Sequence, residues 1–175
     1  MIKVNNLHKS FGDTKVLKGI STVFEAGKTN LIIGQSGSGK TVLLKCLLGL
    51  FDYKEGSIAY DESIFSTLSD NEKRTLRSKI GMVFQGGALF DSLTIAENVM
   101  FPLRMFTKQS RSEMEDRVNS ALKRVNLEGA HDKMPSEASG GMQKRVAIAR
   151  AIVNNPKYLF CDEPNSGLDP KTAIV

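Results

Sequence analysis

The stretch GQSGSGKT, residues 34–41, constrains the fold of this chain more than any other part of it. It fits the pattern G-x-x-x-x-G-K-[ST] in full. The apolar run TNLII, residues 29–33, predicts a strand before it, and residues 40–50 predict a helix after it. A glycine loop between a strand and a helix is the context of a phosphate-binding loop, which predicts an α/β core. A glycine- and serine-rich linker, the simpler interpretation, would not need the Lys-Thr pair.

Each residue type in this loop suits a phosphate. Glycine lets successive N–H groups turn toward the β-phosphate without a Cβ clash, and the helix N-terminus adds its positive end. Lys40 is expected to bridge the β- and γ-phosphates, and the Thr41 hydroxyl to bind Mg²⁺. The predicted nucleotide-binding residues of the loop are Gly34, Gln35, Ser36, Gly37, Ser38, Gly39, Lys40 and Thr41.

Two adjacent acids, Asp162 and Glu163, end the apolar run YLFC. By themselves, such neighbours more often form a solvated face or a turn. A phosphate-binding loop, however, needs an acid at the end of a neighbouring strand to hold Mg²⁺ and its water shell, and Asp162 is placed to supply it. Glu163 is then placed to orient or deprotonate the attacking water.

The remaining periodicity predicts strands and helices around this loop. Alternating apolar residues predict short strands at about 2–7 and 20–24, separated by a turn at 11–13. Further strands are predicted at 56–60, 79–84 and 157–161. Ser69 with Glu72 predicts a capping box before a short helix.

Residues 88–153 carry helical rather than strand periodicity. One predicted helix, behind a cap at Ser112 and Glu115, places on one face Met114, Val118, Ala121, Leu122 and Val125. A last helix is predicted at about 141–153. We expect an α/β core over residues 1–87 and 145–175, with a helical subdomain over about 88–144 inserted into it.

Composition narrows the possible partners and the compartment. The chain has 175 residues, of which 41% are hydrophobic, so we expect one globular domain. The net charge of +5 arises from 24 basic residues interspersed with 19 acidic ones, and with no Trp we expect no nucleic-acid partner. Cys46 and Cys161 lie in apolar runs and are predicted to be buried free thiols. No signal sequence or membrane span is recognisable, so we expect a soluble, cytoplasmic protein.

The segment PSEASGGMQ, residues 135–143, leads directly into the predicted last helix. It resembles the LSGGQ signature of the ATP-binding-cassette (ABC) ATPase family. Ser139, Gly140 and Gly141 agree, while Ala138 replaces Leu and Met142 replaces Gln. A Ser-Gly-Gly sequence at a helix N-terminus is itself suited to phosphate binding; a flexible helix cap is the simpler alternative.

Further motifs extend this resemblance over the whole chain. Phe11 matches the aromatic residue that stacks on adenine, Gln85 matches the Q-loop glutamine, and Ser166 to Asp169 match the D-loop. The resemblance implies a P-loop NTPase core with a parallel sheet, an N-terminal antiparallel β subdomain and an inserted α-helical subdomain. It also implies a homodimer in which Ser139, Gly140, Gly141 and Asp169 contact nucleotide, and in which Gln85 contacts Mg²⁺ or water and senses the γ-phosphate.

Within the family, residues 84–99, FQGGALFDSLTIAENV, and SGGMQKR look like the ATPase subunit of Mla-type phospholipid transporters, although Asn165 stands where Thr is commoner. This implies transmembrane permease subunits, an MCE-type lipid-binding protein and a peripheral location on the cytoplasmic face of the inner membrane. Leu89, Phe90 and Leu93 could equally form a groove for a helix of the permease or belong to the core of the helical subdomain.

Family members carry a switch-region histidine after the D-loop, and the 175 residues end before it. From the sequence we therefore expect a single, incomplete ABC domain over residues 1–175 that hydrolyses ATP poorly. Two alternatives remain open: an ABC-type ATPase that acts on nucleic acid or ribosomes, and a nucleotide-binding module that does not hydrolyse ATP.

Overall fold

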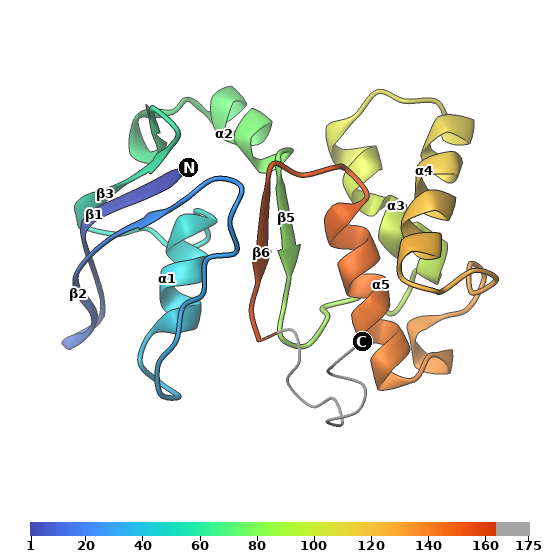
Figure 1. Cartoon of the computed structure of the whole chain (residues 1–175), viewed down its shortest axis with the longest axis horizontal. Helices are drawn as coiled ribbons and strands as arrows, with labels where there is room; N and C mark the ends of the chain where they lie inside the picture. Colours follow the sequence, from blue (N-terminus) through green and yellow to red (C-terminus); the bar gives the residue numbers. More distant parts are fainter. Residues whose placement is uncertain (164–175) are drawn as a thin grey trace. The chain divides into compact units, whose positions relative to one another are not determined.

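The computed structural model describes residues 1–163 (Figure 1). The chain divides into two compact units, Met1–Arg74 and Thr75–Val175. Each unit has its own sheet and helices, and the division into a core of 1–87 and 145–175 and a helical subdomain of 88–144 stays a prediction.

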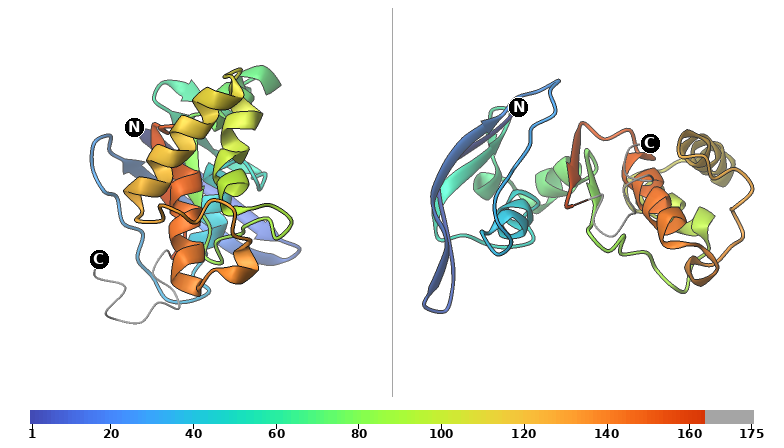
Figure 2. Two further views of the ribbon diagram at one scale, coloured as in Figure 1. Left: turned by 90° about the vertical axis from the view of Figure 1, so that its right-hand side faces the viewer. Right: turned by 60° about the horizontal axis from the view of Figure 1, so that its bottom comes forward.

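The first unit contains a four-stranded antiparallel sheet with the strand order β2-β1-β3-β4. Its strands are β1 (Ile2–Phe11), β2 (Thr14–Phe24), β3 (Glu55–Tyr60) and β4 (Ser63–Ile64). β1 and β2 form the long hairpin seen in Figure 2. Alternation buries Ile2 and Val4 on β1, and an irregularity between Val4 and Leu7, where Asn6 has a φ of 46°, shifts the alternation so that Leu7 is buried as well. The predicted N-terminal antiparallel sheet is confirmed, with a hairpin longer than expected.

Helix α1 (Lys40–Leu47) follows the glycine loop and ends three residues earlier than predicted. Gly49 has a φ of 67°, its N–H donates to the carbonyl of Cys46, and the N–H of Leu50 donates to that of Lys45. These two hydrogen bonds form a Schellman motif, in which the left-handed glycine ends the helix. The short elements η1 (Phe65–Thr67) and α2 (Asp70–Arg77) follow β4, and the predicted capping box of Ser69 and Glu72 is present.

The predicted strand at residues 29–33 is wrong. The structure shows no strand there, and Leu31 and Ile33 are 81% and 82% exposed. A strand exists only when its backbone is paired with a neighbour, and no described segment pairs with these residues. The apolar run predicted burial, but periodicity alone cannot supply the partner.

Up to residue 163, the second unit combines a parallel strand pair with three α-helices. β5 (Ile80–Val83) pairs with β6 (Tyr158–Cys161) in a register that runs from Ile80 opposite Tyr158 to Val83 opposite Cys161. The helices are α3 (Ile95–Phe106), α4 (Arg111–Arg124) and α5 (Gly140–Ile152), with the short η2 (Pro135–Glu137) before α5. β6 exposes Cys161, so the prediction of two buried thiols is right for Cys46 and wrong for Cys161.

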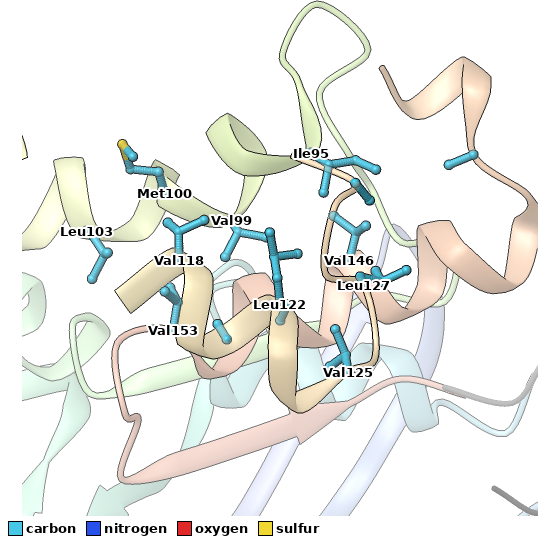
Figure 3. Close-up of a cluster of buried hydrophobic side chains, with 14 residues drawn as sticks. Ile95, Val99, Met100, Leu103, Val118, Leu122, Val125, Leu127, Val146 and Val153 are labelled. Atoms are coloured by element: carbon cyan, nitrogen blue, oxygen red, sulfur yellow. The ribbon is translucent and has the colours of Figure 1, made fainter. Parts of the chain in front are cut away.

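The three helices enclose one apolar cluster, drawn in Figure 3, with their packing visible in Figure 2. α3 contributes Ile95, Val99 and Leu103, α5 contributes Val146, and the predicted face of α4 lies here with Val118, Ala121 and Leu122 buried. The periodicity of residues 114–125 is thus confirmed.

The predicted cap of α4 is wrong by two residues. The sequence SRSEME contains two overlapping S-x-x-E patterns. The structure uses the first: Glu113 accepts from the N–H of Ser110 at 2.7 Å, and Ser110 accepts from that of Glu113 at 3.3 Å. Glu115 instead pairs with Arg111 at 2.8 Å, one turn apart on the same helix.

Asn98 on α3 is fully buried and organises the loop that precedes the helix. Its Oδ1 accepts from the N–H of Phe90 at 2.8 Å, and its Nδ2 donates to the carbonyls of Phe90, Leu93 and Thr94 at 3.0–3.1 Å. The side chain therefore replaces a backbone pairing partner for residues 90–94.

Replacing Asn98 by alanine is expected to lower the free energy of unfolding by about 2–4 kcal/mol, because buried backbone groups lose their partner. Urea unfolding would measure the change. Asn119→Ala on the exposed side of α4 is the matched control, for which we expect a change under about 1 kcal/mol. Equal effects of the two substitutions would contradict the role given to Asn98.

Candidate nucleotide-binding site

The glycine loop of the first unit presents backbone donors at the start of α1. Gly37 and Gly39 have φ angles of 78° and 97°, in the left-handed region that favours glycine. A Cβ on Gly39 would lie only 3.1 Å from the side chain of Val16 and 3.2 Å from that of Leu17, so a larger residue would be crowded against β2 as well as strained by the positive φ. Gly39 is also the N-cap of α1, whose first turn contains no acid. The N–H groups that begin the helix thus suit an anion such as phosphate.

Lys40 lies within the curve of this loop. Its Nζ donates to the carbonyls of Gly34 at 2.9 Å and Gln35 at 3.1 Å. An ammonium held by two loop carbonyls is positioned to exchange them for phosphate oxygens at small reorganisation cost. Thr41 follows in the first turn of α1. The arrangement therefore fits a polyphosphate, and the exposed Gln35, Ser36 and Ser38 complete the loop.

Phe11 ends β1 with 45% of its surface exposed. Its ring meets Phe51 edge-on, with centroids 5.3 Å apart, and the Nζ of Lys9 lies 4.9 Å from the Phe11 centroid. Such neighbours restrain the ring while leaving surface on which a base can stack. Phe51 was missed by sequence reasoning, because 40 residues separate it from Phe11.

Gln85, Asp162 and Glu163 lie together in the second unit. β5 and β6 are parallel, so their carboxyl ends meet at one edge of the pair, and the register Val83–Cys161 continues toward Gln85 and Glu163. The Nε2 of Gln85 donates to Oε2 of Glu163 at 2.9 Å, and the N–H of Asp162 donates to the carbonyl of Val83 at 2.9 Å. The exposed carboxylate of Glu163 is thereby held beside the Q-loop glutamine.

The signature segment begins α5. Ser139 is the N-cap and accepts from the N–H of Met142 at 3.3 Å. A Cβ on Gly140 or Gly141 would have no neighbour within 4 Å, and the first turn contains no acid. Open backbone donors at the start of a 13-residue helix form a second site suited to phosphate.

Gln143 supports the loop that leads to this helix. Its Nε2 donates to the carbonyls of Pro135 at 2.9 Å and Ala138 at 3.2 Å. Gln143 lies one position after the five residues that correspond to the signature, and no role was predicted for it from the sequence. Its contacts show that it fixes the approach to Ser139.

The predicted site residues thus fall into two groups. The loop residues and Phe11 belong to the first unit; Gln85, Asp162, Glu163 and the signature belong to the second. The predicted D-loop residue Asp169 lies outside the described residues.

Residues 1–163 contain no cluster of three or more His, Cys, Asp or Glu that could hold a metal by itself. The predicted Mg²⁺ ligands Thr41, Gln85 and Asp162 stay a prediction.

A cavity of about 410 Å³ lies beside the Q-loop in the second unit. Its lining includes Phe84, Ala88, Phe90, Phe101, Phe106 and Arg150. The sequence left open whether residues 89–93 form a groove or belong to the helical core. Phe90 lines the cavity and is 42% exposed, as expected for a groove, whereas Leu89 packs against the helical core. No helix within residues 1–163 has the length and hydrophobicity needed to cross a membrane.

Comparisons with known proteins agree on one family. A family model described as ABC transporter matches residues 17–166. The probable ribonucleotide transport ATP-binding protein mkl of Mycobacterium tuberculosis (strain H37Rv) is 44% identical over 175 residues, which cover 99% of this chain and 49% of mkl. The methionine import ATP-binding protein MetN of Clostridium tetani is 45% identical over 172 residues, which cover 98% of this chain and 54% of MetN. The chain thus spans about half the length of these curated relatives.

A solved structure shows the same fold. The dimeric, post-hydrolysis ATP-binding cassette MJ0796, bound to ADP and phosphate, superimposes with a TM-score of 0.90 and 36% identity. The match covers 99% of this chain and 78% of that one. The fold is therefore that of an ABC cassette, an α/β fold with an antiparallel β subdomain, and the chain belongs to the ABC transporter family.

Proposed function

We propose that this chain binds and hydrolyses Mg-ATP as the ATPase subunit of a transporter. The observation that carries the proposal is the Gln85–Glu163 hydrogen bond at the carboxyl ends of β5 and β6, in a chain that also holds a glycine loop closed around Lys40. A phosphate-binding loop alone supports nucleotide binding. A carboxylate held beside a glutamine at a strand end supports hydrolysis as well.

Each residue has a distinct proposed role in the reaction. The N–H groups of the loop and Lys40 hold the β- and γ-phosphates, and Phe11 stacks on adenine. Mg²⁺, held by Thr41, Asp162 and Gln85, would neutralise charge on the phosphates. Glu163 orients a water and takes its proton, while Gln85 fixes the carboxylate of Glu163 through the observed 2.9 Å bond.

A second copy of the chain is proposed to complete the site. Ser139, Gly140 and Gly141 form the start of α5, where the space beside both glycines is open. The first turn contains no acidic side chain that would compete with an anion for the N–H groups. In a head-to-tail dimer these donors would meet the γ-phosphate on the partner's loop, so that two ATP molecules close the dimer and hydrolysis reopens it. The dimeric state of the related cassette supports this arrangement.

Substituting Phe11 by alanine tests whether the bound molecule is a nucleotide rather than a simple polyphosphate. Loss of one base–aromatic stack is worth about 1–3 kcal/mol, so we expect ATP affinity to fall about 5- to 100-fold. Affinity for inorganic tripolyphosphate should stay within about twofold of the unsubstituted chain. Calorimetric titration with both ligands measures this, and equal losses for both would exclude base stacking by Phe11.

The cavity beside the Q-loop is proposed to receive a short apolar helix from a transmembrane permease. Its aromatic lining and the exposed Phe90 support this use. The chain would then lie peripherally on the cytoplasmic face of the inner membrane.

For the transported substrate, the resemblance of residues 84–99 to Mla-type ATPases supports the more specific hypothesis of phospholipid translocation with an MCE-type partner. The names of mkl and MetN instead refer to ribonucleotide and methionine.

Phe90→Glu is expected to abolish co-purification with the permease, because a charge would be buried against an apolar helix. Leu159→Glu serves as the matched control and should leave co-purification unchanged, because Leu159 is an apolar residue of similar exposure on β6 that does not line the cavity. Retained binding by the Phe90 variant would count against the cavity as the docking site. Salt-sensitive RNA or DNA binding would instead favour the nucleic-acid alternative.

A further inference from the structure

We infer that Arg150 is a positioning residue that ties the signature helix to the turn carrying Gln85, and that it keeps Gln85 within reach of Glu163. The inference deepens the proposed function, on which it rests for the role of Gln85 toward the γ-phosphate. Its structural part depends only on contacts inside the second unit.

Arg150 lies on α5 and is only 8% exposed. Its Nη1 donates to the carbonyl of Ala88 at 2.7 Å, and its Nη2 donates to that of Gly87 at 2.6 Å. One planar guanidinium therefore holds two successive carbonyls, a geometry that a single-point donor such as lysine cannot reproduce. The contact joins positions that are more than 60 residues apart in the chain.

The two carbonyls belong to an unusual backbone segment directly after Gln85. Gly87 and Ala88 have φ angles of 72° and 47°, so both are left-handed. For alanine this conformation is unfavourable, and it persists only where the surroundings enforce it. The N–H of Gly87 also donates to the carbonyl of Phe84 at 2.9 Å, which closes a turn with Gln85 and Gly86 at its centre. Arg150 thus holds the end of the turn that presents Gln85.

The positive charge of Arg150 is stabilised only while the turn keeps its two carbonyls beside the guanidinium. Within residues 1–163, Arg150 has no ion pair with a carboxylate, and its burial lowers the pKa of the guanidinium. Removing a guanidinium from water is unfavourable, and the two short bonds offset this cost only while both carbonyls stay in place. Moving the turn away from α5 would break both bonds.

α5 is in turn closely packed on β5. A Cβ on Gly81 of β5 would collide with the carbonyl oxygen of Ala151, the residue after Arg150. The C-terminal end of α5 is therefore in backbone contact with the start of β5 through Ala151 and is linked through Arg150 to the turn that follows β5. A displacement of the signature helix would move the turn, and with it the Gln85–Glu163 bond.

Amide hydrogen exchange of Arg150→Lys tests the structural part without any nucleotide. We expect exchange over residues 84–90 to rise about tenfold, while α3 and α4 keep their protection. Arg145→Lys is the matched control, because Arg145 is an exposed arginine on the same helix. Arg150→Met, which buries no charge, serves as a second variant in case the lysine impairs folding. An unchanged turn, or an equal rise throughout α3 and α4, would overturn the inference.

A double-mutant cycle in ATP turnover tests the functional part. Arg150→Lys should lower kcat about tenfold with little change in KM, because Gln85 is misplaced rather than the nucleotide released. In a Gln85→Ala background the same substitution should have no further effect on kcat. Additive losses would show that Arg150 does not act through Gln85. If the unsubstituted protein binds no ATP, the proposed function fails, while the exchange result still decides the role of Arg150 in the turn.

Discussion

Replacing Glu163 by glutamine is expected to lower ATP turnover about 100-fold or more while leaving the affinity for Mg-ATP nearly unchanged. Glutamine has the shape of glutamate but cannot take a proton from water. Glu163 is exposed at the end of β6, where its carboxylate accepts from Nε2 of Gln85, and its proposed partner in the reaction is the attacking water. The loss should therefore fall on the chemical step and not on binding.

Phosphate release at saturating Mg-ATP, with affinity measured separately by calorimetry, would separate these two effects. Glu128→Gln, at an exposed glutamate before η2 in the same unit, is the matched control and should keep full turnover. If Glu163→Gln hydrolysed ATP as fast as the unsubstituted protein, a group other than Glu163 would have to take the proton from the attacking water. A parallel fall in affinity would mean that Glu163 contacts the nucleotide in the ground state.

Replacing Lys40 by alanine is expected to reduce the affinity for Mg-ATP about 10- to 100-fold. A charge-assisted hydrogen bond contributes about 1.5–3 kcal/mol, and the Nζ of Lys40 already lies within 3.1 Å of two carbonyls of the loop. The loss should apply equally to inorganic tripolyphosphate, since Lys40 is proposed to contact phosphate and not the base. This behaviour is the opposite of that expected for Phe11→Ala.

Lys54→Ala, which removes an exposed lysine elsewhere in the first unit, is the control for a general loss of positive charge. Its affinity for ATP should stay close to that of the unsubstituted chain. A similar fall in both variants would mean that nonspecific attraction, rather than the loop, governs binding.

Features that depend on neighbouring residues could be predicted from the sequence. The glycines of residues 34–41, the capping box at Ser69 and the apolar face of α4 all specify geometry within one or two turns of chain. That Gln85 and Glu163 lie close together could be predicted in part. Apolar runs predicted both strands, and two parallel strands place their carboxyl ends together.

Features that depend on distant partners could not be predicted. Residues 29–33 have the composition of a strand, but the sequence does not say what pairs with them. Arg150 is the one basic residue of the apolar stretch AIARAIV, and only the fold brings Gly87 and Ala88 to it. SRSEME contains two overlapping capping patterns, and the sequence does not say which of them is used; in the structure it is the first.

Sedimentation velocity of the Glu163→Gln protein, with and without Mg-ATP, tests most directly whether ATP is bound between two copies. The proposal predicts a dimer with saturating Mg-ATP and a monomer with ADP or without nucleotide. It also predicts that adding Ser139→Arg keeps the protein monomeric although ATP still binds, because the start of α5 is then blocked. A protein that stays monomeric when saturated with ATP, or a dimer that persists with the Ser139 substitution, would contradict it.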